Sequence, residues 1–132
     1  MLRGPGEIFR FDLTSHKLYI KIILAMQVGI CRIRFRLPKN LSLKGKRQIV
    51  KSITTRVGSR FNVAVAEVDD NDLWQLATLG ISCISNDKRQ VNEILSRVVD
   101  FIANNRFEIE LLDYEIEILP VFGDQANLAT GA

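Results

Sequence analysis

Residues 26–119 are predicted to form one α+β domain with the element order β-α-β-β-α-β. Four segments alternate apolar and polar residues in the manner of half-buried strands, and two carry apolar residues at helical spacing. Proline or polar residues separate these six segments. The chain has 132 residues, of which 47% are hydrophobic and 25% charged. That length and composition are typical of a single globular domain.

The first strand and the first helix are predicted from the spacing of the apolar residues, which changes from every second residue to a helical repeat. In residues 29–37, apolar residues alternate with three arginines, which predicts a strand with one buried face. Pro38 ends the strand, and Ser42 can cap a helix that runs to about Gly58. The apolar positions of this helix recur at helical spacing; they are Leu43, Ile49, Val50, Ile53 and Val57.

The middle of the chain predicts a β-hairpin. Residues 62–68 are rich in valine and alanine, and the polar run 69–72 forms a turn. Residues 77–83 return as a strand that has small residues on its outer face. Trp74, in the same hairpin, and Phe61 are expected to pack at the edges of the core rather than to stack on a ligand.

The second helix and the last strand complete the pattern. Ser85, Asn86 and Asp87 supply capping side chains for a helix that ends at Asn104. The last strand covers residues 112–118, and Pro120 is expected to end it. Its core-facing residues are predicted to be Leu112, Tyr114, Ile116 and Ile118.

Two β-α-β units joined by a turn predict a four-stranded antiparallel sheet in the order 4-1-3-2, with both helices on one face. This is the ferredoxin-like arrangement. Residues 1–25 are interpreted as an optional N-terminal extension, which a misassigned start codon would explain. Residues 120–132 are interpreted as a C-terminal tail.

The charge is distributed unevenly along the chain. Between Arg32 and Arg60 there are ten basic residues and no acid, whereas residues 67–124 contain thirteen acids and four basic residues. In the predicted sheet, the arginine row of the first strand lies beside the acidic row of the last strand. A ladder of cross-strand ion pairs is therefore expected, and an exposed binding stripe of arginines is the alternative. The rows are Arg32, Arg34 and Arg36, and Asp113, Glu115 and Glu117.

The first helix has no acid to neutralise its basic side chains. They are predicted to bind RNA or phosphate. The free amide groups at the helix N-terminus, which favour an anion, are expected to contribute to this binding. A solvated helix face is the alternative. The set is Lys44, Lys46, Arg47, Lys51, Arg56 and Arg60.

Several kinds of site are excluded for the predicted domain. His16 is the only histidine and lies in the extension, so the domain has no Ser-His, Cys-His or His-metal arrangement. Cys31 and Cys83 lack CxxC spacing and are expected to be buried free thiols. We expect no enzyme, cofactor or metal, and a cytoplasmic location. The longest apolar run, residues 18–26, is interrupted by Lys21 and is shorter than the about 20 residues that span a bilayer.

Six segments, in this order, resemble those of one bacterial family. They are Leu43-Lys44-Gly45-Lys46-Arg47, Arg60-Phe61-Asn62-Val63, Ala66-Glu67-Val68, Ser85-Asn86-Asp87, Val91-Asn92-Glu93 and Leu112-Asp113-Tyr114-Glu115-Ile116. The family is the YlxP-like family (domain of unknown function 503), and the resemblance covers residues 26–120. It implies a small cytoplasmic bacterial protein with a ferredoxin-like fold, no established activity and genes often near those of translation initiation and ribosome maturation.

The leading functional hypothesis is a non-enzymatic RNA- or ribosome-associated factor that uses the basic first helix. The first alternative is a self-associating homodimer, because small outer residues would let a second sheet approach. Those residues are Ala64, Ala66, Thr78, Gly80 and Ser82. The second alternative is a regulatory module that binds a small anion.

Overall fold

The computed structural model describes residues 26–123, so the predicted extension 1–25 and most of the predicted tail lie outside the described residues. The element order is the predicted one. The elements are β1 (Met26–Arg36), α3 (Leu43–Arg60), β2 (Ala64–Asp69), β3 (Leu76–Ser85), α4 (Lys88–Asn104) and β4 (Glu110–Val121).

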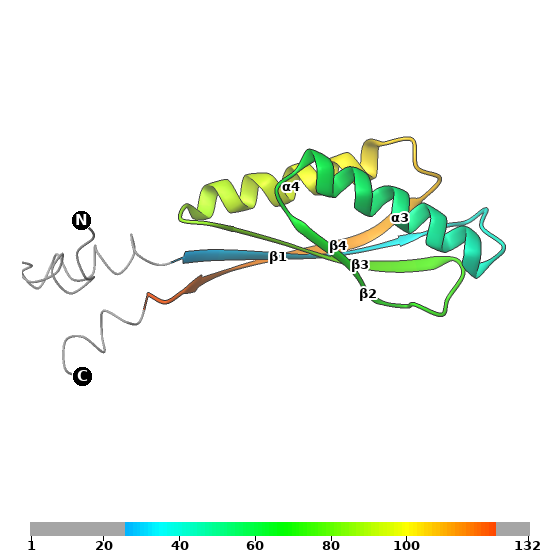
Figure 1. Cartoon of the computed structure of the whole chain (residues 1–132), viewed down its shortest axis with the longest axis horizontal. Coiled ribbons are helices and arrows are strands. Elements are labelled where there is room, and N and C mark those ends of the chain that lie inside the picture. Colours follow the sequence, from blue (N-terminus) through cyan, green and yellow to red (C-terminus); the bar gives the residue numbers. More distant parts are fainter. Residues whose placement is uncertain (1–25, 124–132) are drawn as a thin grey trace, which may run out of the picture.

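The four strands form one sheet in the order β2-β3-β1-β4, and each neighbouring pair is antiparallel. Both helices lie over the same face of this sheet (Figure 1). The opposite face, called the open face below, carries no helix. The predicted α+β, ferredoxin-like arrangement is confirmed.

The core lies between the helices and the sheet. Alternate residues of β1, among them Ile33 and Phe35, are fully buried and pack with Leu79 of β3 and Leu95 of α4. The residues between them point to the open face, as the strand period of two requires. The open face therefore receives the arginines of β1.

Both helices begin at side-chain caps. The Ser42 hydroxyl accepts a hydrogen bond from the Gly45 amide at 2.9 Å, and the Asp87 carboxylate accepts one from the Arg89 amide at 2.9 Å. Each cap satisfies an amide that has no partner within its own helix. Ser42 was predicted as the cap, and Asp87 is the cap among the three candidates before α4.

The last strand differs from the prediction at both ends. A β-bulge places Leu111, rather than Leu112, opposite Phe35 and against the core. Leu112 and Tyr114, both predicted to face the core, are 42% and 50% exposed. β4 also continues through Pro120, because an edge strand tolerates a residue without an amide hydrogen.

Candidate functional site

The predicted ladder of ion pairs joins β1 and β4 on the open face. Arg32 lies opposite Glu115 with a 3.0 Å contact, and Arg34 lies opposite Asp113 at 3.8 Å. The third arginine, Arg36, contacts Glu110 at 4.0 Å. The ladder is confirmed for these rows, and all of its side chains remain at least 40% exposed. Exposed pairs of this kind contribute about 0–1 kcal/mol each.

The prediction that Glu117 belongs to the ladder is wrong. Glu117 lies opposite Ile30 rather than an arginine. The bulge in β4 shifts the register by one residue and places Glu110 opposite Arg36, so that Glu110 completes the acidic row. Arg34 has a second acidic neighbour in the β2–β3 hairpin, because its Nε atom lies 4.0 Å from the Asp70 carboxylate.

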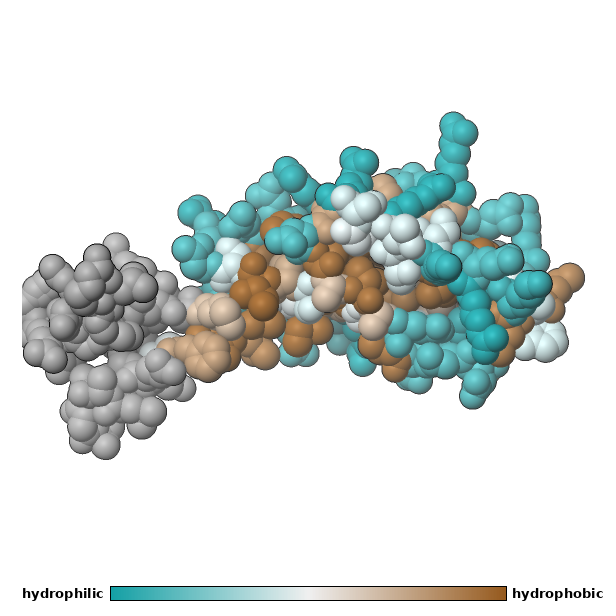
Figure 2. All heavy atoms as spheres, in the orientation of Figure 1, coloured by the Kyte–Doolittle hydropathy of each residue, from teal (hydrophilic) through white to brown (hydrophobic). Residues whose placement is uncertain are grey.

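The six basic residues predicted as a phosphate site fall into three groups. Lys44, Arg47 and Lys51 form the first, called the basic flank below. Their spacing of three and four residues places them on one flank of α3, and all three are exposed. α3 contains no acid, and within residues 26–123 none of the three makes an ion pair within 4.0 Å. Figure 2 shows hydrophilic side chains gathered over the helices.

Lys46 alone forms the second group, and the expectation that it is free to bind phosphate is wrong. Its side chain is 1% exposed and points into the protein, where Nζ lies 2.9 Å from Glu67 Oε2. Nζ also donates a hydrogen bond to the main-chain carbonyl of Asp70. Glu67 Oε2 has no partner with hydrogen-bond geometry, so its contact with Lys46 is one of charge. Lys46 thus ties α3 to β2 and the hairpin.

Arg56 and Arg60 form the third group, at the end of α3. The Arg60 guanidinium lies 5.1 Å from the ring centre of Phe101, and that of Arg56 lies 5.4 Å from the ring centre of Phe107. Phe61, partly buried as predicted, packs edge to face on Phe101. Cation–π contacts therefore direct Arg60 toward α4 and Arg56 toward the segment that follows α4.

The N-terminus of α3 offers less to an anion than the sequence suggested. The Gly45 amide is already bonded to Ser42. The Asn40 side-chain oxygen sits so close to Gly45 that an added Cβ would overlap it. Phosphate binding at this end of the helix therefore depends on the lysine and arginine side chains.

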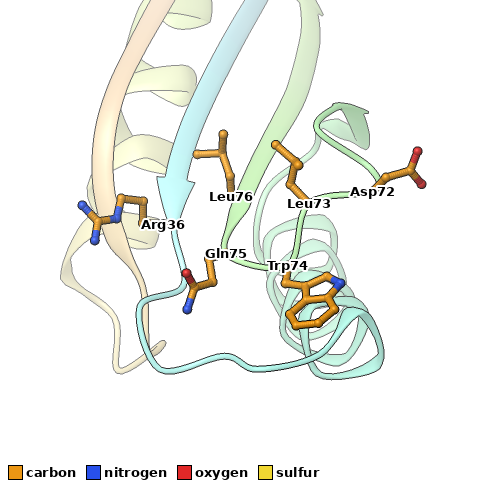
Figure 3. Close-up of a pocket in the computed structure, with 6 residues that line it drawn as sticks. All are labelled: Arg36, Asp72, Leu73, Trp74, Gln75 and Leu76. Atoms are coloured by element: carbon orange, nitrogen blue, oxygen red, sulfur yellow. The ribbon is translucent and has the colours of Figure 1, made fainter.

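Trp74 is exposed, contrary to the prediction. Its exposed fraction is 54%, and it lines a hollow open to solvent (Figure 3). The hollow lies where β1 ends and β3 begins, and Arg36 and Gln75 also line it. The sequence carried no signal for this exposure, because the length of the hairpin beyond the sheet depends on the strand register.

The two cysteines are free and buried, as predicted. Burial raises the pKa of the Cys31 thiol to about 11 and also raises the pKa of Cys83. Both thiols therefore stay protonated near neutral pH, which makes them poor nucleophiles and poor metal ligands. In residues 26–123 no group of three or more His, Cys, Asp or Glu side chains is placed to hold a metal ion.

An apolar row crosses the open face where β1 begins and β4 ends. Ile84 of β3 and Leu119 of β4 both lie opposite Val28 of β1, and Ile30 follows on the same face. Three of these side chains are 45–61% exposed, namely Ile30, Ile84 and Leu119. Hydrophobic residues gather at this end of the sheet in Figure 2.

The small residues predicted to admit a second sheet are partly covered. Val68 packs over Gly80, because a Cβ added to Gly80 would lie 2.8 Å from a Val68 methyl group. Thr78 is 2% exposed and its hydroxyl donates to Asp70 at 2.5 Å. Ala64 and Ala66 remain exposed on the edge strand.

These features define a small α+β domain of the ferredoxin-like arrangement, with an ion-pair ladder on its open face and a basic flank on α3 that has no ion pair to another described residue. The chain belongs to the family described as "Protein of unknown function (DUF503)", which matches residues 28–116. It is 43% identical over 61 residues to "Uncharacterized protein YlxP" of Bacillus subtilis (strain 168). The aligned part covers 46% of this chain and 66% of that protein. The predicted family is confirmed.

Two solved structures are similar in outline. The de novo designed protein Foldit4 is 19% identical with a TM-score of 0.40, and the match covers 71% of this chain and 96% of Foldit4. The designed protein Ferredog-Diesel is 13% identical with a TM-score of 0.35, and the match covers 68% of this chain and 83% of that one. Likenesses of this extent say nothing about function. Neither α3 nor α4 is long and apolar enough to cross a membrane.

Proposed function

We propose that this protein is a non-enzymatic RNA- or ribosome-associated factor that contacts phosphates through the basic flank of α3. The observation that carries the proposal is the exposure of Lys44, Arg47 and Lys51 on one flank of an acid-free helix. The proposal leaves out Lys46, which Glu67 neutralises. It places the protein in the cytoplasm, in keeping with two free thiols.

The open face is a weaker candidate for phosphate. Each of the three arginines of β1 has an acidic partner on β4, so a phosphate would have to displace a carboxylate. On the basic flank, by contrast, a phosphate replaces only water and counterions. The flank is therefore the surface on which binding should depend most steeply on salt.

The test is the affinity for labelled single-stranded RNA, measured by fluorescence anisotropy. Replacing Lys44, Arg47 and Lys51 together by glutamate should weaken binding by about tenfold or more, because three attractive contacts become repulsive. The matched control replaces Lys88, Arg89 and Arg106, three exposed basic residues elsewhere, by glutamate. Both variants change the net charge equally, so equal losses, or no loss, would reject the basic flank.

We propose self-association as a second candidate function, because the apolar row on the open face is exposed. A two-fold axis running along the strands between β1 and β4 would place β1 of one copy over β4 of the other. The row would then meet its own copy, and Arg32 of one copy would face Glu115 of the other. Such an isologous contact pairs Val28 with Leu119 and Arg32 with Glu115, whereas Ile30 of one copy lies over Glu117 of the other.

Sedimentation tests this second candidate. Leu119→Lys should convert a dimer to a monomer, since it places a charge where β4 of one copy lies over Val28 of the other. Leu41→Lys is the control, because Leu41 is 79% exposed in the loop before α3. A wild-type chain that stays monomeric at high concentration would exclude the dimer.

A further inference from the structure

Trp74 is the only tryptophan in the chain, and more than half of its surface faces solvent. A large aromatic ring left in water forgoes the burial that stabilises such residues in a core. Leu73, the preceding residue, is 49% exposed, so the indole belongs to a small exposed apolar patch. Exposed apolar patches that contain a tryptophan are typical of binding sites. Neither the ion-pair ladder nor the basic flank accounts for it.

The main chain at Trp74 is held by hydrogen bonds from distant residues. The Asn40 side-chain amide donates to the Trp74 carbonyl at 2.5 Å and to the Ser42 carbonyl at 2.7 Å. The Gln75 side-chain amide donates to the Asn40 carbonyl at 3.0 Å, and the Leu37 amide donates to the Gln75 carbonyl at 3.0 Å. The backbone that carries the ring therefore loses little conformational freedom when a ligand stacks on the indole.

The same bonds hold Trp74 near the basic flank. Asn40 bridges Trp74 to Ser42, which is the N-cap of α3, and Lys44 lies in the first turn of that helix. A ligand that covers the indole therefore begins close to the first cation of the flank. A nucleic acid strand, which alternates bases and phosphates, fits this succession of an aromatic ring and positive charges.

The lining of the hollow favours a flat ring with polar edges. Leu73 and Leu76 supply apolar surface to the lining, and Arg36, Gln75 and Asp72 supply a guanidinium, an amide and a carboxylate. In Figure 3 the side chains of Leu73 and Leu76 extend from the main chain away from the indole. Guanidinium and carboxylate groups hydrogen-bond the edges of nucleobases. The Gln75 side-chain nitrogen already donates to the Pro38 and Asn40 carbonyls. A free phosphate is a poorer occupant because the Asp72 carboxylate lies in the lining.

We propose that Trp74 is a stacking platform for one unpaired base of a single-stranded RNA whose phosphates contact the basic flank. The inference rests on the proposed function and narrows its ligand to unpaired RNA. Bases of a duplex are stacked on each other and cannot cover the indole. A protein that docks on Trp74 and Leu73 through apolar contacts is the competing occupant.

Because the chain has a single tryptophan, its intrinsic tryptophan fluorescence reports on Trp74 alone. The probe is a single-stranded RNA of mixed sequence about 12 nucleotides long, and the same RNA annealed to its complement. The single strand should quench the fluorescence of Trp74 as it binds, and the duplex should not. Quenching by the duplex equal to that by the single strand would overturn the inference.

Affinity measurements on two variants complete the test. Trp74→Ala should weaken binding of the single strand by about 5- to 150-fold, the range found when one base loses its aromatic partner. Trp74→Phe should restore most of that loss, because the phenyl ring still stacks. The dependence of affinity on salt should be the same in both variants as in the wild type, since no phosphate contact is removed.

Failure of the inference and failure of the proposed function look different. Salt-dependent binding without quenching, and with Trp74→Ala at wild-type affinity, overturns the stacking platform and leaves the basic flank standing. No binding of either RNA by the wild type overturns both. A loss in Trp74→Ala that Trp74→Phe does not restore indicates that the RNA needs a feature of the indole other than a stacking ring, and overturns base stacking.

Discussion

Replacing Lys46 by methionine should destabilise the protein far more than the same change at an exposed lysine. The substitution keeps an unbranched side chain, one atom shorter, but leaves Glu67 without its cation, in a site where only 18% of the Glu67 side chain is exposed. Breaking a buried ion pair costs about 3–5 kcal/mol, and the residual exposure of Glu67 favours the lower end, about 3 kcal/mol. For a domain of this size, that loss lowers the melting temperature by about 12 °C or more.

Chemical denaturation with urea, followed by circular dichroism, measures this loss directly. The control is Lys44→Met, in the same helical turn but exposed, which should change the free energy of unfolding by less than about 0.5 kcal/mol. The double variant Lys46→Met with Glu67→Leu should recover most of the loss, because no charge is left unpaired. Equal effects of Lys46→Met and Lys44→Met, or a double variant as unstable as Lys46→Met, would refute the buried pair.

Three further predictions concern the sheet. Gly29→Ala should cost about 1–3 kcal/mol in urea denaturation, because the added Cβ would overlap Val91 and lie 2.8 Å from Leu95. Arg32→Ala should cost less than about 1 kcal/mol by the same assay, because its ion pair is exposed. Above pH 9 the unfolded Cys31 thiol ionises while the folded one, with a pKa of about 11, does not. Stability should therefore fall between about pH 9 and 11, a loss that Cys31→Ala should reduce, leaving the part that comes from Cys83.

Each of these predictions has an outcome that contradicts it. A Gly29→Ala variant of wild-type stability would mean that α4 sits farther from β1 than described. A loss of several kcal/mol in Arg32→Ala would mean that the ladder is buried by another molecule. An alkaline loss of stability that persists unchanged in Cys31→Ala would have a different titrating group as its cause.

The topology could be predicted because the spacing of apolar residues, the helix-capping residues and the turn residues all indicate the same element boundaries. Alternation in β1 and the helical spacing in α4 each fix one buried face, and the short hairpin leaves one way to pair β2 with β3. The bulge in β4 could not be predicted in the same way. Leu111 and Leu112 are both leucines, so only the pairing with β1 decides which of them faces the core.

The candidate site was predicted less completely. The burial of Lys46 could have been predicted from its position, since it shares the helical spacing of the buried residues Val50, Ile53 and Val57. The prediction considered only its charge. A lysine on the buried stripe of a helix requires an acidic partner in the core, and Glu67 supplies it. The exposure of Trp74 had no such signal, because it depends on how far the hairpin extends beyond the sheet.

The most direct test of the basic flank is the salt dependence of RNA binding in a charge-neutralised variant. The wild type and a variant with Lys44, Arg47 and Lys51 all changed to glutamine are titrated with single-stranded RNA at several salt concentrations. If the three side chains contact phosphates, the slope of log affinity against log salt should become shallower by about 2 units. An identical slope in both proteins would show that phosphates bind elsewhere or not at all.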